Sequence, residues 1–115
     1  MKVNNISREL IGASAIPLIL AILKEGDSYG YEIIQKVYEL SNEKIKWKDG
    51  SLYPVLKKLE QQGYIRSYWN TSGTRARRYF SLLQVGEKEL EKEFHNWQLI
   101  HTMLIQLCKP QPNSI

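Results

Sequence analysis

Two runs of β-forming residues, set between helical patterns, constrain the fold of this chain more than any other feature. Tyr64–Trp69 and Arg77–Leu82 are separated by the polar segment Asn70–Ala76, which contains Gly73. This arrangement predicts a β-hairpin with a long tip. A single hairpin cannot bury its apolar residues by itself, so it has to pack against helices. We therefore expect a mainly α-helical α+β fold with one β-hairpin.

The first helix is predicted from Ala15 to Lys24. Ser14 can serve as its N-cap, Pro17 is tolerated only near a helix start because it lacks a backbone N–H, and Gly26 ends the helix. Residues 6–13 are then expected as a separate short turn, or as a segment across a kink.

A second, amphipathic helix is predicted from Tyr29 to Leu40, with Asp27 or Ser28 as its cap. The segment Asn42–Lys48 is expected to be a connection, in which Ile45–Trp47 has the composition of a short strand.

The third helix begins near Asp49 or Gly50 and ends at Gly63. Its residues divide between an apolar and a polar face, so the apolar face is expected in the core. The expected core residues are Leu52, Val55, Leu56 and Leu59. The residues on the polar face are Ser51, Pro54, Lys57, Lys58 and Gln61.

The last helix is predicted from Gly86 to Leu107, where bulky residues recur at steps of four and three. We expect a first domain over residues 1–82, this helix within residues 83–108 and a flexible tail over residues 109–115. The apolar stripe of the helix is wider than the first domain can cover, so a two-fold partner is expected to cover it. The candidate dimer interface consists of Leu90, Phe94, Trp97, Ile100, His101, Leu104 and Leu107.

Positive charge is concentrated in the middle of the chain. The segment from Lys44 to Arg78 contains nine basic and two acidic residues, whereas the whole chain has a net charge of only +4. This asymmetry indicates a polyanionic partner, with nucleic acid first and an anionic membrane second. The alternative is a solvated basic surface without a partner.

Three helices followed by a hairpin with a basic tip form the element order of a winged helix-turn-helix, in which the third helix enters the major groove of duplex DNA. Arg75 and Arg77 lie beside the glycine-bearing tip, suited to phosphate contact or to a narrow minor groove, and strand alternation separates them from Arg78. The candidate DNA-contacting residues are Lys48, Ser51, Tyr53, Pro54, Lys57, Lys58, Thr74, Arg75, Arg77 and Arg78.

Trp97 stands in the middle of the last helical stripe. In a dimer, the two copies can approach the symmetry axis and sandwich a flat apolar ligand, with Phe94 and His101 beside them. The alternative is that Trp97 only packs in the interface.

We expect no catalytic residue, metal ion or cofactor. His95 and His101 are separated by about 240° around a helix, and Cys108 stands about 10 Å along the axis from His101, so these side chains cannot converge. The single cysteine fits a reducing compartment. The apolar run Ile11–Leu23 is too short to cross a bilayer, and Lys24–Asp27 after it offers no small-residue cleavage site. We therefore expect a cytoplasmic protein.

Three segments resemble the PadR-type family of transcriptional regulators. Tyr29–Ile33 reads YGYEI, Gly50–Gly63 reads GSLYPVLKKLEQQG, and Arg77–Phe80 reads RRYF. The shorter, multidrug-sensing (LmrR-like) members, which have one C-terminal helix, are the most similar.

The resemblance implies a homodimeric repressor whose last helix forms the dimer contact and whose operator affinity falls when a small aromatic or drug-like effector binds. In the short members a tryptophan pair at the dimer centre stacks on planar compounds, and Trp97 occupies a similar place. Two features depart from the family pattern. Leu83 stands where the family has a threonine N-cap, a difference of about 0.5–2 kcal/mol, and Pro17 lies inside the first helix of the family.

Two other partner classes stay open. A winged helix can serve as a protein-interaction module without specific DNA binding, because a fold does not fix a function. Binding of RNA or of a single DNA strand would instead use aromatic stacking platforms. The candidate residues for such a platform are Tyr64, Tyr68, Trp69 and Tyr79.

Overall fold

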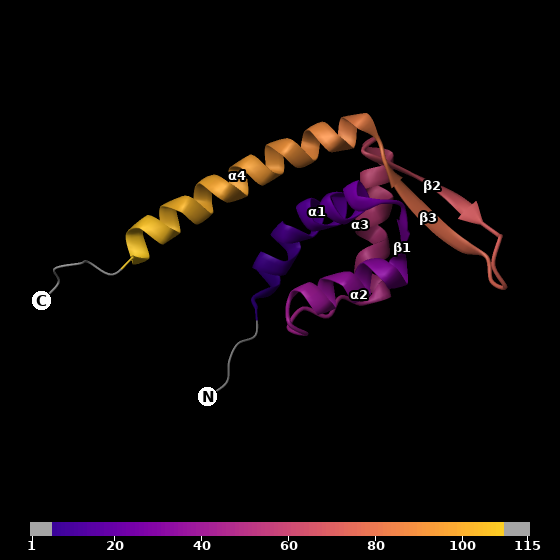
Figure 1. Ribbon diagram of the computed structural model, residues 1–115, viewed down its shortest axis with the longest axis horizontal. Helices are drawn as coiled ribbons and strands as arrows, with labels where there is room; N and C mark the ends of the chain where they lie inside the picture. The colour runs from indigo at the N-terminus through magenta and orange to yellow at the C-terminus, as the bar shows by residue number, and fades with distance from the viewer. Residues whose placement is uncertain (1–5, 110–115) are drawn as a thin grey trace, which may run out of the picture.

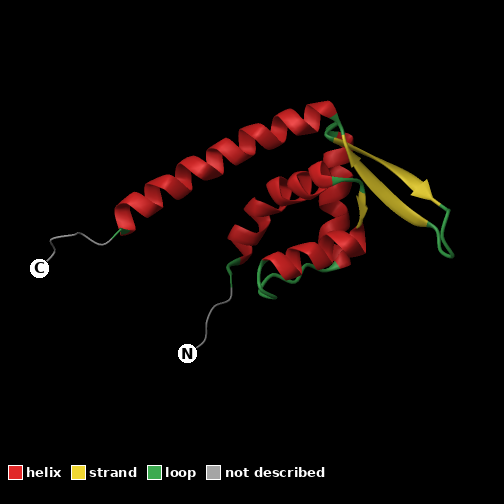
Figure 2. Cartoon of the chain, viewed as in Figure 1, coloured by secondary structure: helices red, strands yellow, loops and turns green. Residues whose placement is uncertain are grey.

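The computed structural model describes residues 6–109. In chain order its elements are α1 (Arg8–Glu25), β1 (Ser28–Tyr29), α2 (Gly30–Leu40), α3 (Asp49–Gln61), β2 (Ile65–Asn70), β3 (Arg77–Leu82) and α4 (Gln84–Cys108). The first three helices pack together, the β2–β3 hairpin projects from one side, and α4 extends away on the other (Figure 1). Figure 2 shows that helix dominates, so the expected α+β fold with a hairpin wing is confirmed.

The sheet has three strands in the order β1-β3-β2, all antiparallel to their neighbours. The strand β1 was not predicted, because two residues are too short to show a period of two. Ser28 pairs with Phe80 and Tyr29 with Tyr79. The prediction that Asp27 or Ser28 caps α2 is wrong: Tyr29 is the N-cap and makes no side-chain cap hydrogen bond.

The helix α1 begins earlier than the sequence analysis predicts. Ser7 is its N-cap and accepts a hydrogen bond from the backbone N–H of Leu10 (3.1 Å), so Ser14 is not the cap. Residues 8–13 belong to this helix, and Pro17 lies well inside it. Because Pro17 has no N–H, the carbonyl of Ala13, four residues earlier, lacks its helical hydrogen-bond donor. Ala13 is an exposed residue.

The hydrophobic core joins the helices to the root of the sheet. Its largest fully buried side chains are Ile19, Leu20, Ile33, Leu56, Leu59 and Ile65. In α3 the predicted apolar face is confirmed, with Leu52, Leu56 and Leu59 buried and Val55 partly buried. Residues 45–47 form no strand; Trp47 is instead buried in the core, so its apolar character reflects packing and not strand pairing.

The helix α4 is anchored at its N-terminal end. Leu83 is the N-cap and makes no side-chain hydrogen bond, as expected from the missing threonine. Gly86 and Leu90 are the buried residues of α4. The division into units at residues 82 and 108 stays a prediction, and the predicted tail lies outside the described residues except for Lys109. Within residues 6–109, no helix is long and apolar enough to cross a membrane.

Candidate nucleic-acid interface

The outward face of α3 carries the polar side chains predicted to meet DNA. Ser51, Tyr53, Pro54, Lys57 and Lys58 are exposed, because Leu52, Leu56 and Leu59 turn the opposite face into the core. Lys48, the N-cap of α3, is exposed as well. The buried face thus fixes the rotation of α3 about its axis, and with it the row of polar groups that faces solvent.

Tyr53 lies against the first turn of α2. A Cβ atom at Gly30 would stand only 2.9 Å from Cζ of Tyr53, and nearer still to its hydroxyl oxygen. The glycine therefore provides the space for the tyrosine ring, which remains 43% exposed. The YGYEI and GSLYP segments meet at this contact between α2 and α3.

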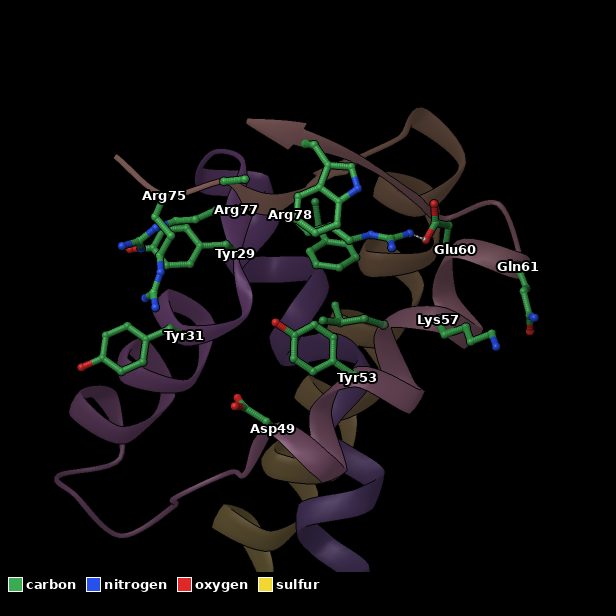
Figure 3. Close-up of a pocket in the computed structure, with 14 residues that line it drawn as sticks. Tyr29, Tyr31, Asp49, Tyr53, Lys57, Glu60, Gln61, Arg75, Arg77 and Arg78 are labelled. Carbon is green, nitrogen blue, oxygen red and sulfur yellow. Dashed lines mark hydrogen bonds and ion pairs between the residues drawn. The ribbon is translucent and has the colours of Figure 1, made fainter. Parts of the chain in front are cut away.

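An open groove of about 1200 Å³ separates α3 from the wing, the β2–β3 hairpin with its tip (Figure 3). We call it the wing groove. Its aromatic lining consists of Tyr29, Tyr31, Tyr53, Trp69 and Phe80. Its basic lining consists of Lys57, Arg75, Arg77 and Arg78, and Asp49 and Glu60 supply its acidic groups. A groove with this excess of positive charge attracts an anionic ligand.

Arg75 and Arg77 stand together on one side of the wing groove, beside Tyr29 (Figure 3). The guanidinium carbon of Arg77 lies 4.4 Å from the centre of the Tyr29 ring, a cation–π contact. Stacking through the flat face of the guanidinium leaves its N–H edge available for a phosphate oxygen. Among residues 6–109, neither arginine forms an ion pair with an acidic side chain.

Arg78 has a different environment, as strand alternation predicts. Its Nη2 atom lies 3.5 Å from Oε1 of Glu60 and donates a hydrogen bond to Oγ of Ser67 (2.8 Å). The Ser67 hydroxyl in turn donates to Oε2 of Glu60 (2.8 Å). Of the predicted DNA-contacting residues on the wing, Arg78 is therefore the one that the structure ties to α3.

The four residues of the predicted stacking platform do not share one surface. Tyr68 and Tyr79 stack on each other across the two strands, with ring centres 5.9 Å apart. Trp69 follows Tyr68 and lies on the opposite face, toward the wing groove, while Tyr64 packs against the core. A continuous row of aromatic rings for single-stranded bases is thus absent from this set.

The sequence analysis missed the contacts at the outer face of the sheet, because they depend on β1. Tyr29 packs on Tyr79 with ring centres 5.2 Å apart. The Tyr68 hydroxyl donates a hydrogen bond to Oδ2 of Asp27 (2.6 Å), and this bond raises the pKa of Tyr68 above its usual value. Together these contacts join both strands of the wing, through Tyr68 and Tyr79, to residues 27–29, the segment before α2.

Most of the predicted interface residues on α4 are exposed in the single chain. Phe94 is 63% exposed and Leu107 78%, with Ile100, His101 and Leu104 also exposed and Trp97 half-buried. Leu90 is the exception, because it is buried in the core of its own chain, and its place in a dimer interface stays a prediction. The candidate interface does not include four further exposed apolar residues of α4, namely Val85, Leu99, Met103 and Ile105. Among residues 6–109, no group of three or more His, Cys, Asp or Glu side chains converges as metal ligands do.

Comparison with known proteins agrees with this geometry. The model of the transcriptional regulator PadR-like family matches residues 19–92, which include the end of α1, the whole of α2 and α3, the sheet and the root of α4. The chain belongs to the PadR-like family. The family resemblance read from the motifs is therefore confirmed, and with it the DNA-binding winged-helix fold. Assignment to the multidrug-sensing subtype stays a prediction.

Solved structures of bacterial transcriptional regulators share most of this architecture. A transcriptional regulator from Clostridium thermocellum is 32% identical, with a TM-score of 0.79 over 88% of this chain and 99% of that chain. A PadR family regulator from Clostridium difficile R20291 is also 32% identical, with a TM-score of 0.73 over 83% of this chain and 98% of that chain. The negative transcriptional regulator PadR of Bacillus subtilis is 29% identical over 94 residues, which are 81% of this chain and 50% of that protein. This chain thus aligns with half the length of the Bacillus regulator.

Proposed function

We propose that this PadR-like regulator is a homodimeric repressor that binds operator DNA through α3 and the wing tip. The observation that carries the proposal is the arrangement around the wing groove. The polar face of α3 stands on one side, and the guanidinium groups of Arg75 and Arg77 stand on the other. Repression is proposed by analogy with the Bacillus subtilis relative, which is a negative transcriptional regulator.

The proposed binding mode follows from dimensions and charge. An α-helix fits the DNA major groove, where Ser51, Tyr53 and Lys57 reach base edges and phosphates. The wing tip, with Thr74 and Arg75, then meets the backbone or the adjacent minor groove. The phosphate backbone between the two contacts runs along the wing groove, whose basic side chains neutralise it.

The proposed dimer rests on the apolar surface of α4. Beyond its root this helix exposes Phe94, Ile100 and Leu104 to solvent over a long arm. A helix that is apolar over most of its circumference requires a partner, and a second copy gives a closed two-fold arrangement. Such a dimer presents two copies of α3, which matches a pseudo-palindromic operator with half-sites about one helical turn apart. Binding to chromosomal DNA would place this dimer in the cytoplasm.

The proposed effector site is centred on Trp97. Trp97 is partly exposed in the single chain, and Phe94 and His101 lie at neighbouring positions of the same helix. Two such faces across the dimer axis suit a planar aromatic compound, whose binding would lower operator affinity. Packing of Trp97 within the interface, without a ligand, is the alternative outcome.

The operator proposal is tested by fluorescence anisotropy with the DNA upstream of the protein's own coding region, titrated against salt and against unrelated duplex. A dimer with about six to ten phosphate contacts loses roughly three to five decades of affinity between ~50 and ~200 mM salt. The double variant Arg75→Glu/Arg77→Glu should abolish specific binding. The control Lys88→Glu/Lys92→Glu makes the same charge change on α4 and should retain it. Equal binding to unrelated DNA would point to a protein-interaction module or to another operator.

The effector proposal is tested by titrating planar aromatic compounds into the wild-type dimer and into Trp97→Ala. The variant should bind them at least about tenfold more weakly while sedimentation still shows a dimer. Trp69→Ala, which removes an exposed indole from the wing groove, is the matched control and should bind them normally. Unchanged affinity in Trp97→Ala would leave Trp97 as an interface residue only.

A further inference from the structure

Three side chains from three different elements form a closed triangle next to the wing groove. Glu60 comes from the last turn of α3, Ser67 from the middle of β2 and Arg78 from the start of β3. Every pair among them is in polar contact, at 2.8 Å, 2.8 Å and 3.5 Å. The Ser67 hydroxyl donates to Glu60 and accepts from Arg78, so both of its polar functions are used. Figure 3 shows the contact between Glu60 and Arg78 across the groove wall.

The triangle lies where it can fix the position of the wing relative to α3. Nearer the root, the wing is fixed by the buried side chains of Ile65 and Phe80. The wing is also fixed by the pairing of β3 with β1 and by the hydrogen bond from Tyr68 to Asp27. On the side toward α3, the polar contacts of the triangle link α3 to both β2 and β3. Arg78 stands next to Arg77 in sequence and pairs with Trp69 across the hairpin, close to the tip.

The surroundings of Arg78 also argue against a direct phosphate contact. Its Nη2 atom already has two protein partners. The Glu60 carboxylate beside it would repel a phosphate if Arg78 turned away from it. Holding Arg78 in the triangle therefore neutralises the Glu60 carboxylate and preserves the positive charge of the wing groove that attracts DNA.

We propose that Glu60, Ser67 and Arg78 form a wing strut, which fixes the angle between the wing and α3. The strut sets the separation between Arg75 and Arg77 on the wing and Lys57 on α3, so Arg78 is a positioning residue and not a DNA contact. This inference rests on the proposed binding of operator DNA. It replaces the prediction that Arg78 meets DNA together with Arg75 and Arg77.

The wing strut can be removed without unfolding the chain. The Arg78 and Glu60 side chains are 45% and 33% exposed, and ion pairs at such positions contribute little to global stability. The core residues beneath the strut stay unchanged. Substitution should therefore loosen the wing while the helices keep their packing.

The experiment is a double-mutant cycle on operator affinity with Glu60→Ala, Arg78→Ala and the double variant. If the strut positions the wing, each single variant binds about tenfold more weakly, and Arg78→Ala has almost no further effect once Glu60 is absent. The weakening by Glu60→Ala is diagnostic, because loss of a negative charge from a DNA-binding face would by itself strengthen binding. Glu91→Ala on α4 removes the same charge at an exposed, distant position and should leave affinity unchanged.

Salt dependence separates positioning from contact. Loss of a phosphate contact lowers the slope of log affinity against log salt by about 0.9 for each site, and Arg75→Ala should show this loss. Arg78→Ala should leave the slope unchanged. Stronger binding by Glu60→Ala, together with a lower slope for Arg78→Ala in both backgrounds, would overturn the strut and make Arg78 a direct contact.

A measurement on the free protein, without DNA, distinguishes failure of the wing strut from failure of the proposed operator binding. Residual dipolar couplings and amide hydrogen exchange of residues 66–80 report the orientation and mobility of the wing in the free protein. Glu60→Ala and Arg78→Ala should change both, and Glu91→Ala should change neither. If wild-type protein fails to bind operator DNA but the wing responds, the proposed function fails and the strut stands. A wing that keeps its orientation and exchange rates in both variants would refute the strut.

Discussion

Gly86 of α4 packs directly against the chain that enters β2, and Gly86→Ala should therefore destabilise the protein. An added Cβ would stand 2.8 Å from Cδ1 of Leu82 and 2.9 Å from the carbonyl carbon of Tyr64, and nearer still to its carbonyl oxygen. The leucine can rotate away. The Tyr64 carbonyl cannot, because it accepts the hydrogen bond from the N–H of Leu83 (3.0 Å) and belongs to the chain entering β2.

The magnitude follows from three opposing terms. Alanine is favoured over glycine in a helix by up to about 1 kcal/mol. Overpacking against a fixed backbone costs about 1–3 kcal/mol, and weakening of the Tyr64–Leu83 hydrogen bond costs about 1 kcal/mol more. Gly86→Ala should thus lower the free energy of unfolding by about 1–3 kcal/mol. Gly12→Ala is the matched control, since nothing lies within 4 Å of its added Cβ in α1, and it should raise stability by about 0.5–1 kcal/mol.

The assay is chemical denaturation followed by circular dichroism, at one fixed protein concentration because dimerisation makes apparent stability depend on concentration. The midpoint should fall for Gly86→Ala and rise for Gly12→Ala, with an unchanged denaturant slope. If Gly86→Ala is as stable as the wild type or more stable, the close approach of α4 to the start of β2 is wrong.

Three further predictions concern other contacts. Gly30→Ala should weaken operator binding with little loss of stability, because its methyl group displaces the exposed tyrosine ring of α3; unchanged anisotropy titrations would contradict this. The pKa of Tyr68 is raised by Asp27, so the stability this hydrogen bond supplies is complete below the unfolded tyrosine pKa of about 10 and is lost as pH rises through the folded value. Asp27→Asn should lower that pKa in an NMR titration of the ring, and an unshifted curve would exclude the carboxylate as its cause. Leu90→Ala should cost about 2–5 kcal/mol of folding stability, whereas Leu104→Ala should mainly raise the dimer dissociation constant in sedimentation; the reverse pattern would place Leu90 in the interface.

The sequence predicts those elements whose pattern is longer than one period. The helix α3, its buried face and the hairpin were predictable because Leu52, Leu56 and Leu59 repeat at helical spacing and because the two β-rich runs alternate. The length of α4 was predictable for the same reason. Charge placement identified the wing tip, since Arg75 and Arg77 sit beside Gly73 in a segment poor in acids.

The remaining features depend on tertiary contacts that leave no local signal. A strand of two residues, such as β1, exists only because β3 supplies its hydrogen-bonding partner. Pro17 was expected near a helix start, but α1 continues through it, because the packing of Ile19, Leu20 and Leu23 in the core favours the helix over the local preference of proline. Leu90 fits the stripe of α4 by spacing, yet the root of α4 packs on the core, and spacing alone cannot tell one apolar environment from another.

The anchoring of α4 offers a physical route from the proposed effector site to the wing. The root of α4 touches the start of β2 through Gly86 and the end of β3 through Leu82. A rotation of α4 would therefore press on the chain that enters β2 and on the end of β3. If a ligand at the proposed Trp97 site rotated α4, the rotation would displace the wing relative to α3 against the wing strut. Under the proposed function, an effector therefore need not touch the DNA-binding surface to weaken operator binding, because a change in the angle of the wing is sufficient.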